Sequence, residues 1–270
     1  MTVQPDLQGL RVLVTRPQAQ ADGLCERLTA AAARVTRVPV IDIRFPDADP
    51  AIEAGLEQLD QADLLIFTSV NAVEGLKRFL TRGSGTWPPT GAEVAAIGAA
   101  TAQRLEAEGI TVGVRPMALY NSEGLLAHPR LHQVGGQRVV LVAGVSGREL
   151  IADTLAERGA DVVKLEVYQR ERPPGLAAAL GAGLSVEPPD VVLVTSVDSL
   201  ESLVESTPPE QKAALLKLGV VTVSARVARA AREQGFSAGI VVADEASDEA
   251  LVTALERWWK RQQTAQADAV

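Results

Sequence analysis

Two hydroxyl side chains, with Asn or Asp two residues later, follow a buried strand pattern at two places in the chain. The first is Thr68-Ser69-Val70-Asn71 and the second is Thr195-Ser196-Val197-Asp198. Each precedes a helical pattern, so hydroxyls and the free N–H groups of a helix N-terminus come together, which suits an anion. Plain helix capping is the alternative at any one site. Two copies of the same pattern favour binding of an anionic ligand.

Other turns carry similar groups. Gly98 permits close approach of a ligand, and Thr101 follows within the first helical turn. The remaining candidate binding residues stand at strand ends or helix starts: Thr15, Arg16, Ser122 (as a helix N-cap), Gly144, Ser146, Gly147, Arg148, Ser224 and Arg226. The arginines among them are suited to forked contacts with carboxylates, although an exposed helix charge is the alternative for Arg148.

One tyrosine is the best proton donor that the chain offers. Only Tyr120 and Tyr168 are present, and Tyr168 has Lys164, Arg170 and Arg172 as near neighbours in sequence. It is our candidate catalytic residue, with simple packing between domains as the alternative.

Several kinds of site lack the residues they need. The turns at 15–20 and 143–148 have no G-x-G-x-x-G spacing, and no phosphate-binding G-x-x-x-x-G-K-[ST] occurs. His128, His132 and Cys25 are the only histidines and cysteine, too few for a zinc site or a Ser-His-Asp triad. We therefore expect no metal and no organic cofactor.

An internal repeat indicates which elements position these residues. Three segments recur at offsets of 126 or 127 residues: Arg11–Thr15 with Arg138–Val142, Ala62–Asn71 with Pro189–Asp198, and Val94–Gly98 with Val220–Ser224. Each unit is a short apolar run, a polar turn and a helical pattern. This predicts an α/β protein with two doubly wound parallel sheets, flavodoxin-like or Rossmann-like, with ligand binding at the carboxyl ends of the strands. We expect the function in a cleft between the two copies.

Two alternating apolar–polar segments, 39–45 and 164–172, are predicted to be connector strands that pair with each other. The polar residues 263–270 are predicted to be a disordered tail.

Composition restricts partners and compartment. With 26 Lys+Arg against 34 Asp+Glu, the net charge is −8, which argues against nucleic acid or an anionic membrane surface. Cys25 is alone, so no internal disulfide forms, and residues 1–10 do not resemble a signal peptide. We expect a cytoplasmic protein without membrane spans.

Five short strings occur in one order along the chain: Thr15-Arg16-Pro17, Phe67–Glu74, Ala96–Ala102, Asn121–Leu125 and Val167–Arg170. Together they resemble uroporphyrinogen-III synthase of bacterial type, over about residues 10–260. The resemblance implies that the domains exchange segments. One domain would be 1–38 with 173–262 and the other 46–163; the repeat alone leaves sequential halves open.

The resemblance also implies a reaction. The substrate would be hydroxymethylbilane, a linear tetrapyrrole with eight carboxylates. The enzyme would expel its terminal hydroxyl as water, invert ring D through a spiro intermediate and close the macrocycle without a cofactor. Tyr168 matches the family tyrosine that is proposed to assist loss of hydroxide, and Thr101 matches a threonine facing the cleft. Val227 stands where the family has a second threonine, so this chain departs from a symmetric threonine pair.

We further expect a monomer that contacts the preceding enzyme of the pathway transiently. Two alternatives stay open: a bilobal protein that binds an anionic small molecule without catalysis, and a two-domain glycosyltransferase, for which no glycine-rich donor loop is present.

Overall fold

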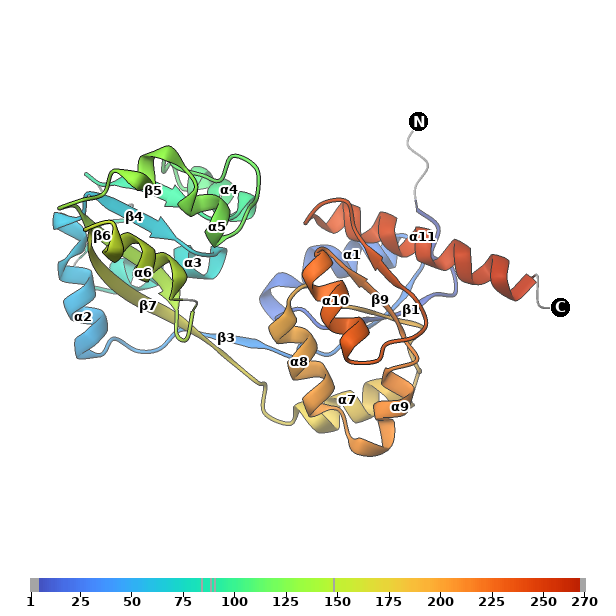
Figure 1. The fold of residues 1–270 in the computed structure, drawn as a ribbon. Coiled ribbons are helices and arrows are strands. Elements are labelled where there is room, and N and C mark those ends of the chain that lie inside the picture. The colour runs from blue at the N-terminus through green and yellow to red at the C-terminus, as the bar shows by residue number, and fades with distance from the viewer. Residues whose placement is uncertain (1–4, 84, 88, 90, 148, 268–270) are drawn as a thin grey trace. The chain divides into compact units, whose positions relative to one another are not determined.

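The chain divides into two compact units (Figure 1). The computed structural model describes residues 5–267 except 84, 88, 90 and 148. Unit 1 combines Met1–Asp42 with Glu171–Val270, and unit 2 is Ile43–Arg170. The first unit therefore contains both ends of the chain, and the second is a single continuous segment.

Unit 1 is built on a five-stranded sheet in the order β10-β9-β8-β1-β2, and all four neighbouring pairs are parallel. The strands are β1 (Arg11–Val14), β2 (Arg34–Arg37), β8 (Val191–Leu193), β9 (Gly219–Thr222) and β10 (Ile240–Val242). The helices are α1 (Asp22–Ala30), α7 (Leu176–Ser185), α8 (Val197–Ser206), α9 (Lys212–Leu215), α10 (Ala225–Glu233) and α11 (Asp248–Ala267), with 3-10 turns at Gln18–Gln20 and Pro209–Gln211. Helices α1 and α11 share a core with one face of the sheet.

Unit 2 has a second five-stranded sheet, in the order β3-β7-β6-β4-β5. Its strands are β3 (Asp42–Arg44), β4 (Leu64–Phe67), β5 (Glu93–Ala96), β6 (Arg138–Gly144) and β7 (Asp161–Glu171). Its helices are α2 (Pro50–Glu57), α3 (Val70–Arg82), α4 (Ala99–Ala107), α5 (Ser122–Leu126) and α6 (Leu150–Glu157), with 3-10 turns at Leu59–Gln61 and Pro129–His132.

The continuous apolar runs form strands that are buried on both faces. In β4, Leu65 and Phe67 join the core under α2, α3 and α4, whereas Leu64 and Ile66 join the core under α5 and α6. Side chains alternate along a strand, so only a run without polar residues fills both cores. The predicted fold class, an α/β protein with two parallel doubly wound sheets, is confirmed.

The repeat is visible in the strand pairing. Val12 lies opposite Val191 where β1 meets β8, and Val139 lies opposite Leu64 where β6 meets β4. These are equivalent positions at the offset of 127 residues, with the halves exchanged. The first strand of each copy thus pairs with the second unit of the other copy.

Two expectations about irregular segments need correction. β7 pairs with β6 from Asp161 to Tyr168, so most of 164–172 belongs to the unit 2 sheet, although β3 is its neighbour as expected. The predicted disordered tail is helical as far as Ala267, and residues 268–270 lie outside the described part. The buried Trp258 anchors this last stretch of α11, and the Gln and Ala residues that follow continue a helix readily.

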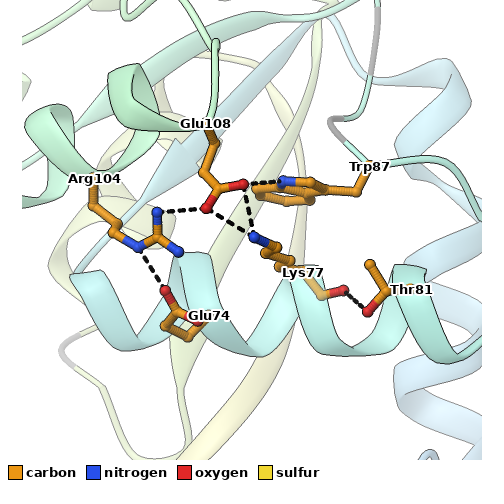
Figure 2. Close-up of polar contacts among 6 residues, drawn as sticks. All are labelled: Glu74, Lys77, Thr81, Trp87, Arg104 and Glu108. Carbon is orange, nitrogen blue, oxygen red and sulfur yellow. Dashed lines mark hydrogen bonds and ion pairs between the residues drawn. The ribbon is translucent and has the colours of Figure 1, made fainter.

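A charged cluster links α3 to α4 (Figure 2). The Glu108 carboxylate accepts hydrogen bonds from Lys77 Nζ at 2.7 and 2.8 Å and from Trp87 Nε1 at 3.1 Å. Arg104 contacts it at 2.5 Å and also donates to Glu74 at 2.6 Å. These donors, Lys77 first, lower the pKa of Glu108 from 4.5 to about 2. The cluster fixes the spacing of two helices whose N-termini carry candidate site residues.

Within the described residues, no helix combines the length and apolar character that crossing a membrane requires.

Candidate functional site

The carboxyl ends of the unit 2 strands bring together the sequence-predicted Ser69, Gly144 and Tyr168. β4, β6 and β7 are parallel neighbours, so the residues that end or follow them lie at one edge of the sheet. We call this the unit 2 edge. The corresponding border of the other sheet, after β1, β8 and β9, is the unit 1 edge.

Tyr168 is held at the unit 2 edge by hydrogen bonds to its phenol oxygen. Ser69 Oγ donates to this oxygen at 3.1 Å and Arg170 Nη2 donates at 3.4 Å. The Arg170 guanidinium also lies 5.8 Å from the ring centroid. Only 3% of Tyr168 is exposed, so the ring belongs to the core and the hydroxyl is its polar end. Phenol, hydroxyl and guanidinium form one polar group.

Gly144 makes room for the tyrosine ring. A β-carbon at this position would lie 2.6 Å from Tyr168 Cζ, closer than any tolerated contact. A register irregularity between Ala143 and Gly144 places Tyr168 opposite Gly144 and leaves Val167 as an extra residue in β7. The backbone N–H of Val145 then donates to the Tyr168 carbonyl at 2.8 Å. The position of Tyr168 therefore depends on both the glycine and the bulge.

The start of α3 supplies the second part of this edge. Ser69 is the N-cap, and its Oγ accepts from Ala72 N at 3.2 Å. Thr68 Oγ1 donates to the Val142 carbonyl at 3.2 Å, and Asn71 lies in the first turn. Ser69 thus combines the capping role with a direct bond to the candidate catalytic residue.

Next along the unit 2 edge, α4 begins at the Gly98 turn. Gly98 is the N-cap, with extended φ and ψ and no side chain over the helix end. Thr101 is buried, and its Oγ1 would lie 3.5 Å from a β-carbon on Gly98. The hydroxyl therefore lies close to the glycine turn.

The predicted cap at Ser122 is wrong by one residue. The N-cap of α5 is Asn121, whose Oδ1 accepts from Gly124 N at 2.7 Å, and Ser122 is the first helical residue. Both Asn and Ser suit an N-cap, and the amide of Asn121 is the group that reaches the free N–H.

The loop after β6 holds the next group of candidates. Ser146 has a φ of 60°, in the left-handed region, and Gly147 N donates to the Gly144 carbonyl at 3.2 Å. Arg148, the predicted carboxylate ligand, lies outside the described residues.

At the unit 1 edge, two candidates are engaged within the unit itself. Thr15 is buried and donates to the Leu193 carbonyl at 2.7 Å. Arg16 pairs with Asp248 Oδ1 at 2.5 Å, at the start of α11. The sequence alone did not predict this ion pair, because an acidic residue in the first turn of a helix is common for other reasons.

The remaining unit 1 candidates start two helices. Ser196 caps α8 and lies 2.7 Å from Ser199 Oγ, with Thr195 just before it. Ser224 caps α10 by accepting from the backbone N of Arg226 at 3.2 Å, and the Arg226 side chain is exposed. The hydroxyl partner of Ser196 is thus a serine, whereas that of Ser69 is a tyrosine.

A pocket of about 780 Å³ lies elsewhere in unit 2, between α2 and the end of α3. α3 starts at the unit 2 edge, so its end lies near the opposite border of the sheet. Asp47, Glu53, Glu57 and Asp60 are among its lining residues, against the cations Arg78 and Arg82. This acidic lining does not suit an anionic ligand, so we place the site at the strand ends. In the described part of the chain, no three His, Cys, Asp or Glu side chains are grouped to hold a metal ion.

Known proteins resemble this chain over most of its length. A family model described as "Uroporphyrinogen-III synthase HemD" matches residues 5–253. Uroporphyrinogen-III synthase of Escherichia coli strain K12 is 33% identical over 248 residues, 92% of this chain and 100% of that protein. The Salmonella typhimurium enzyme of the same name is 32% identical over 249 residues, with the same coverage.

Solved structures share the fold. A mutant uroporphyrinogen III synthase of Thermus thermophilus superposes with a TM-score of 0.66 at 20% identity, over 94% of this chain and 100% of that chain. The Helicobacter pylori enzyme gives 0.59 at 15% identity, over 90% and 97%. Because the family model and two relatives span nearly its whole length, this chain belongs to the uroporphyrinogen-III synthase family.

Proposed function

We propose that this protein converts hydroxymethylbilane into uroporphyrinogen III, with loss of water and inversion of ring D. The chain is a cyclising lyase of tetrapyrrole biosynthesis, and its family membership carries this conclusion. The polar group at Tyr168 supports the chemistry, because loss of a hydroxyl group requires a hydrogen-bond or proton donor at the departing oxygen.

Tyr168 is the proposed donor. The bond between the terminal carbon and its hydroxyl oxygen breaks, the phenol proton goes to that oxygen, and water leaves. The pyrrole electrons of the substrate stabilise the carbon that remains. The proton returns to the phenolate from the pyrrole carbon that is attacked during ring closure, so atoms and charge balance.

Ser69 and Arg170 are the proposed positioning residues for this step. Both donate to the phenol oxygen, and such bonds strengthen as negative charge develops there. Tyr168 is almost fully buried, so the substrate oxygen must approach from the hydroxyl end of the ring.

The substrate carries eight carboxylates, and the protein has a net charge of −8. Binding therefore requires hydrogen-bond donors and cations placed locally. The proposed binding groups at the unit 2 edge are the starts of α3 and α4, with Thr68, Asn71, Gly98 and Thr101, followed by Ser122 and by the loop of Ser146, Gly147 and Arg148. In unit 1 they are Thr195, Ser196, Ser224 and Arg226. Arg16 joins this set only by exchanging Asp248 for a substrate carboxylate.

We also propose that the enzyme needs no cofactor, is monomeric and cytoplasmic, and contacts the preceding enzyme of the pathway transiently. The single buried Cys25 is consistent with a reducing compartment. Activity that survives exhaustive EDTA dialysis supports cofactor independence, and activity that requires an added divalent ion contradicts it.

The decisive experiment is incubation with freshly prepared hydroxymethylbilane, followed by separation of the product isomers. We expect the ring D-inverted isomer to predominate over the non-inverted isomer that forms by chemical cyclisation. A protein that only binds the tetrapyrrole leaves the chemical isomer ratio unchanged, which would overturn the proposal.

A further inference from the structure

Large exposed apolar side chains are concentrated in two loops of unit 2. Among the described residues, the exposed large hydrophobic side chains are Met117, Leu119, Tyr120, Val145, Leu150 and Val186. Met117, Leu119 and Tyr120 lie in the loop before α5, Val145 lies in the turn after β6, and Leu150 is the first residue of α6. We call these five residues the apolar rim.

The two parts of the rim lie at the same edge of the unit 2 sheet. Val114 forms a parallel bridge with Ala95 of β5, so the chain runs at this point in the direction of the strands. The loop that carries Met117 follows Val114 and therefore lies at the carboxyl border. The other loop follows β6 at this border. α5 and α6 pack against each other over a shared core that includes Leu125 and Ile151. Both helices therefore start side by side at the unit 2 edge.

One part of the rim, Val145, adjoins the backbone of Tyr168. Val145 is 44% exposed, and its backbone N–H donates to the Tyr168 carbonyl at 2.8 Å. Gly144, the preceding residue, supports the tyrosine ring. An apolar surface thus begins one residue from the glycine that positions the candidate catalytic side chain.

We propose that the apolar rim binds the faces of the substrate's pyrrole rings, while polar groups of the same edge hold its carboxylates. This inference rests on the proposed function, because a tetrapyrrole chain presents flat apolar rings beside its anionic side chains. Residues 116–121 and 144–147 contain no charged side chain, and the charged Arg148 and Glu149 follow before Leu150. The two uncharged stretches suit a ring face. A protein partner is a poorer fit, because a stable protein interface needs about 800 Å² on each side, more than five side chains in two short loops offer.

The test uses nearly isosteric polar substitutions. Met117→Gln, Leu119→Asn and Val145→Thr, singly and combined, replace apolar contact surface at exposed positions. Val186→Thr is the matched control, since this valine is 81% exposed and lies at the end of α7 in unit 1. Equal thermal unfolding of all variants establishes that they fold.

We expect each single rim variant to raise KM for hydroxymethylbilane about threefold to fivefold and the triple variant more than about tenfold, with kcat within about twofold of wild type. The KM ratio of triple variant to wild type should persist at high salt, because contacts between apolar groups are not screened. Val186→Thr should leave both constants unchanged.

Three results overturn the inference. The first is an unchanged KM in the triple variant of an active enzyme, which leaves the proposed function intact. The second is a fall in kcat at constant KM, which assigns the rim to placement of Tyr168. The third is loss of a concentration-dependent dimer in sedimentation without a change in KM, which assigns it to self-association. If the wild type forms no inverted isomer, the proposed function itself fails.

Discussion

The unit 1 edge and the unit 2 edge share one scaffold and differ in chemistry. Ser69 and Ser196, equivalent at the offset of 127 residues, each cap the helix after a parallel strand. Ser69 also donates to a tyrosine, whereas Ser196 lies beside another serine, Ser199. The residue at the position equivalent to Tyr168 is Ile41, which is buried.

The difference begins with one backbone position. In β7, Glu166 continues the strand, and the bulge that follows places Tyr168 against Gly144. Pro39 stands at the equivalent position in unit 1 and has no N–H to donate, and β2 ends at Arg37. The duplicated halves thus share the helix starts, but only unit 2 has a buried tyrosine at this position, which is why we propose the proton donor there.

The largest expected effect is that of Tyr168→Phe. Turnover of hydroxymethylbilane should fall about 10- to 100-fold because the donor is removed. The ring remains, so the free energy of unfolding should change by only about 1 kcal/mol for the lost hydrogen bonds. Steady-state kinetics and urea unfolding measure the two effects, and undiminished turnover excludes Tyr168 from the mechanism.

Gly144→Ala and Gly219→Ala compare two glycines that lie against aromatic rings. The added β-carbon would meet Tyr168 Cζ at 2.6 Å in the first case and Trp258 Cζ2 at 2.3 Å in the second. Both should lower the free energy of unfolding by about 1–3 kcal/mol. Only Gly144→Ala should also lower kcat, by about tenfold, because it displaces the proposed donor. Equal kcat values in the two variants argue against a positioning role for Gly144.

Ser69→Ala and Ser196→Ala test the equivalent caps. Each removes a side chain that accepts a backbone N–H, so each should lower stability by about 1 kcal/mol. Ser69→Ala should also lower kcat severalfold and alter its pH profile, since the phenol oxygen loses a donor. Ser196→Ala should act on KM alone, and a fall in kcat in this variant contradicts the division between the edges.

The smallest effect concerns acid stability of unit 2. The donors around Glu108 lower its pKa to about 2, so the folded state holds the proton more weakly than the unfolded state. Their stabilisation is full above about pH 4.5 and is lost as the pH falls toward 2. Glu108→Gln should therefore be less stable than wild type at neutral pH, and the difference should shrink across this window in urea unfolding.

Glu106→Gln is the control, in the last turn of α4, which Glu108 directly follows. Its partner is Arg115, and both side chains are 45% exposed, so the substitution should have little effect at any pH. A difference between wild type and Glu108→Gln that stays constant down to pH 2 argues that the cluster does not stabilise the fold through its charge.

Much of the fold could be predicted from the repeat. Runs such as Leu64–Phe67 are apolar throughout, which is typical of strands buried on both faces. This pattern predicted parallel sheets covered by helices on each side. Ser69 and Ser196 were expected at helix starts, and both are N-caps. Asn121 and Ser122 both favour capping, and local chemistry could not choose between them. The helical tail was missed because its anchor, Trp258, is buried by residues distant in sequence.

The sequence by itself determined the repeat, the class of fold, the family and the side chains available for chemistry, because these depend on residue types and on periods of two and 3.6. Only the tertiary structure decided which groups meet. In a regular strand, the side chains of Val167 and Tyr168 would point to opposite faces of the sheet. The bulge opposite Gly144 places both side chains in the same core. Likewise, Arg16 and Asp248 are 232 residues apart in sequence, and the tertiary fold brings them into contact. Such contacts depend on long-range packing, which no local pattern specifies.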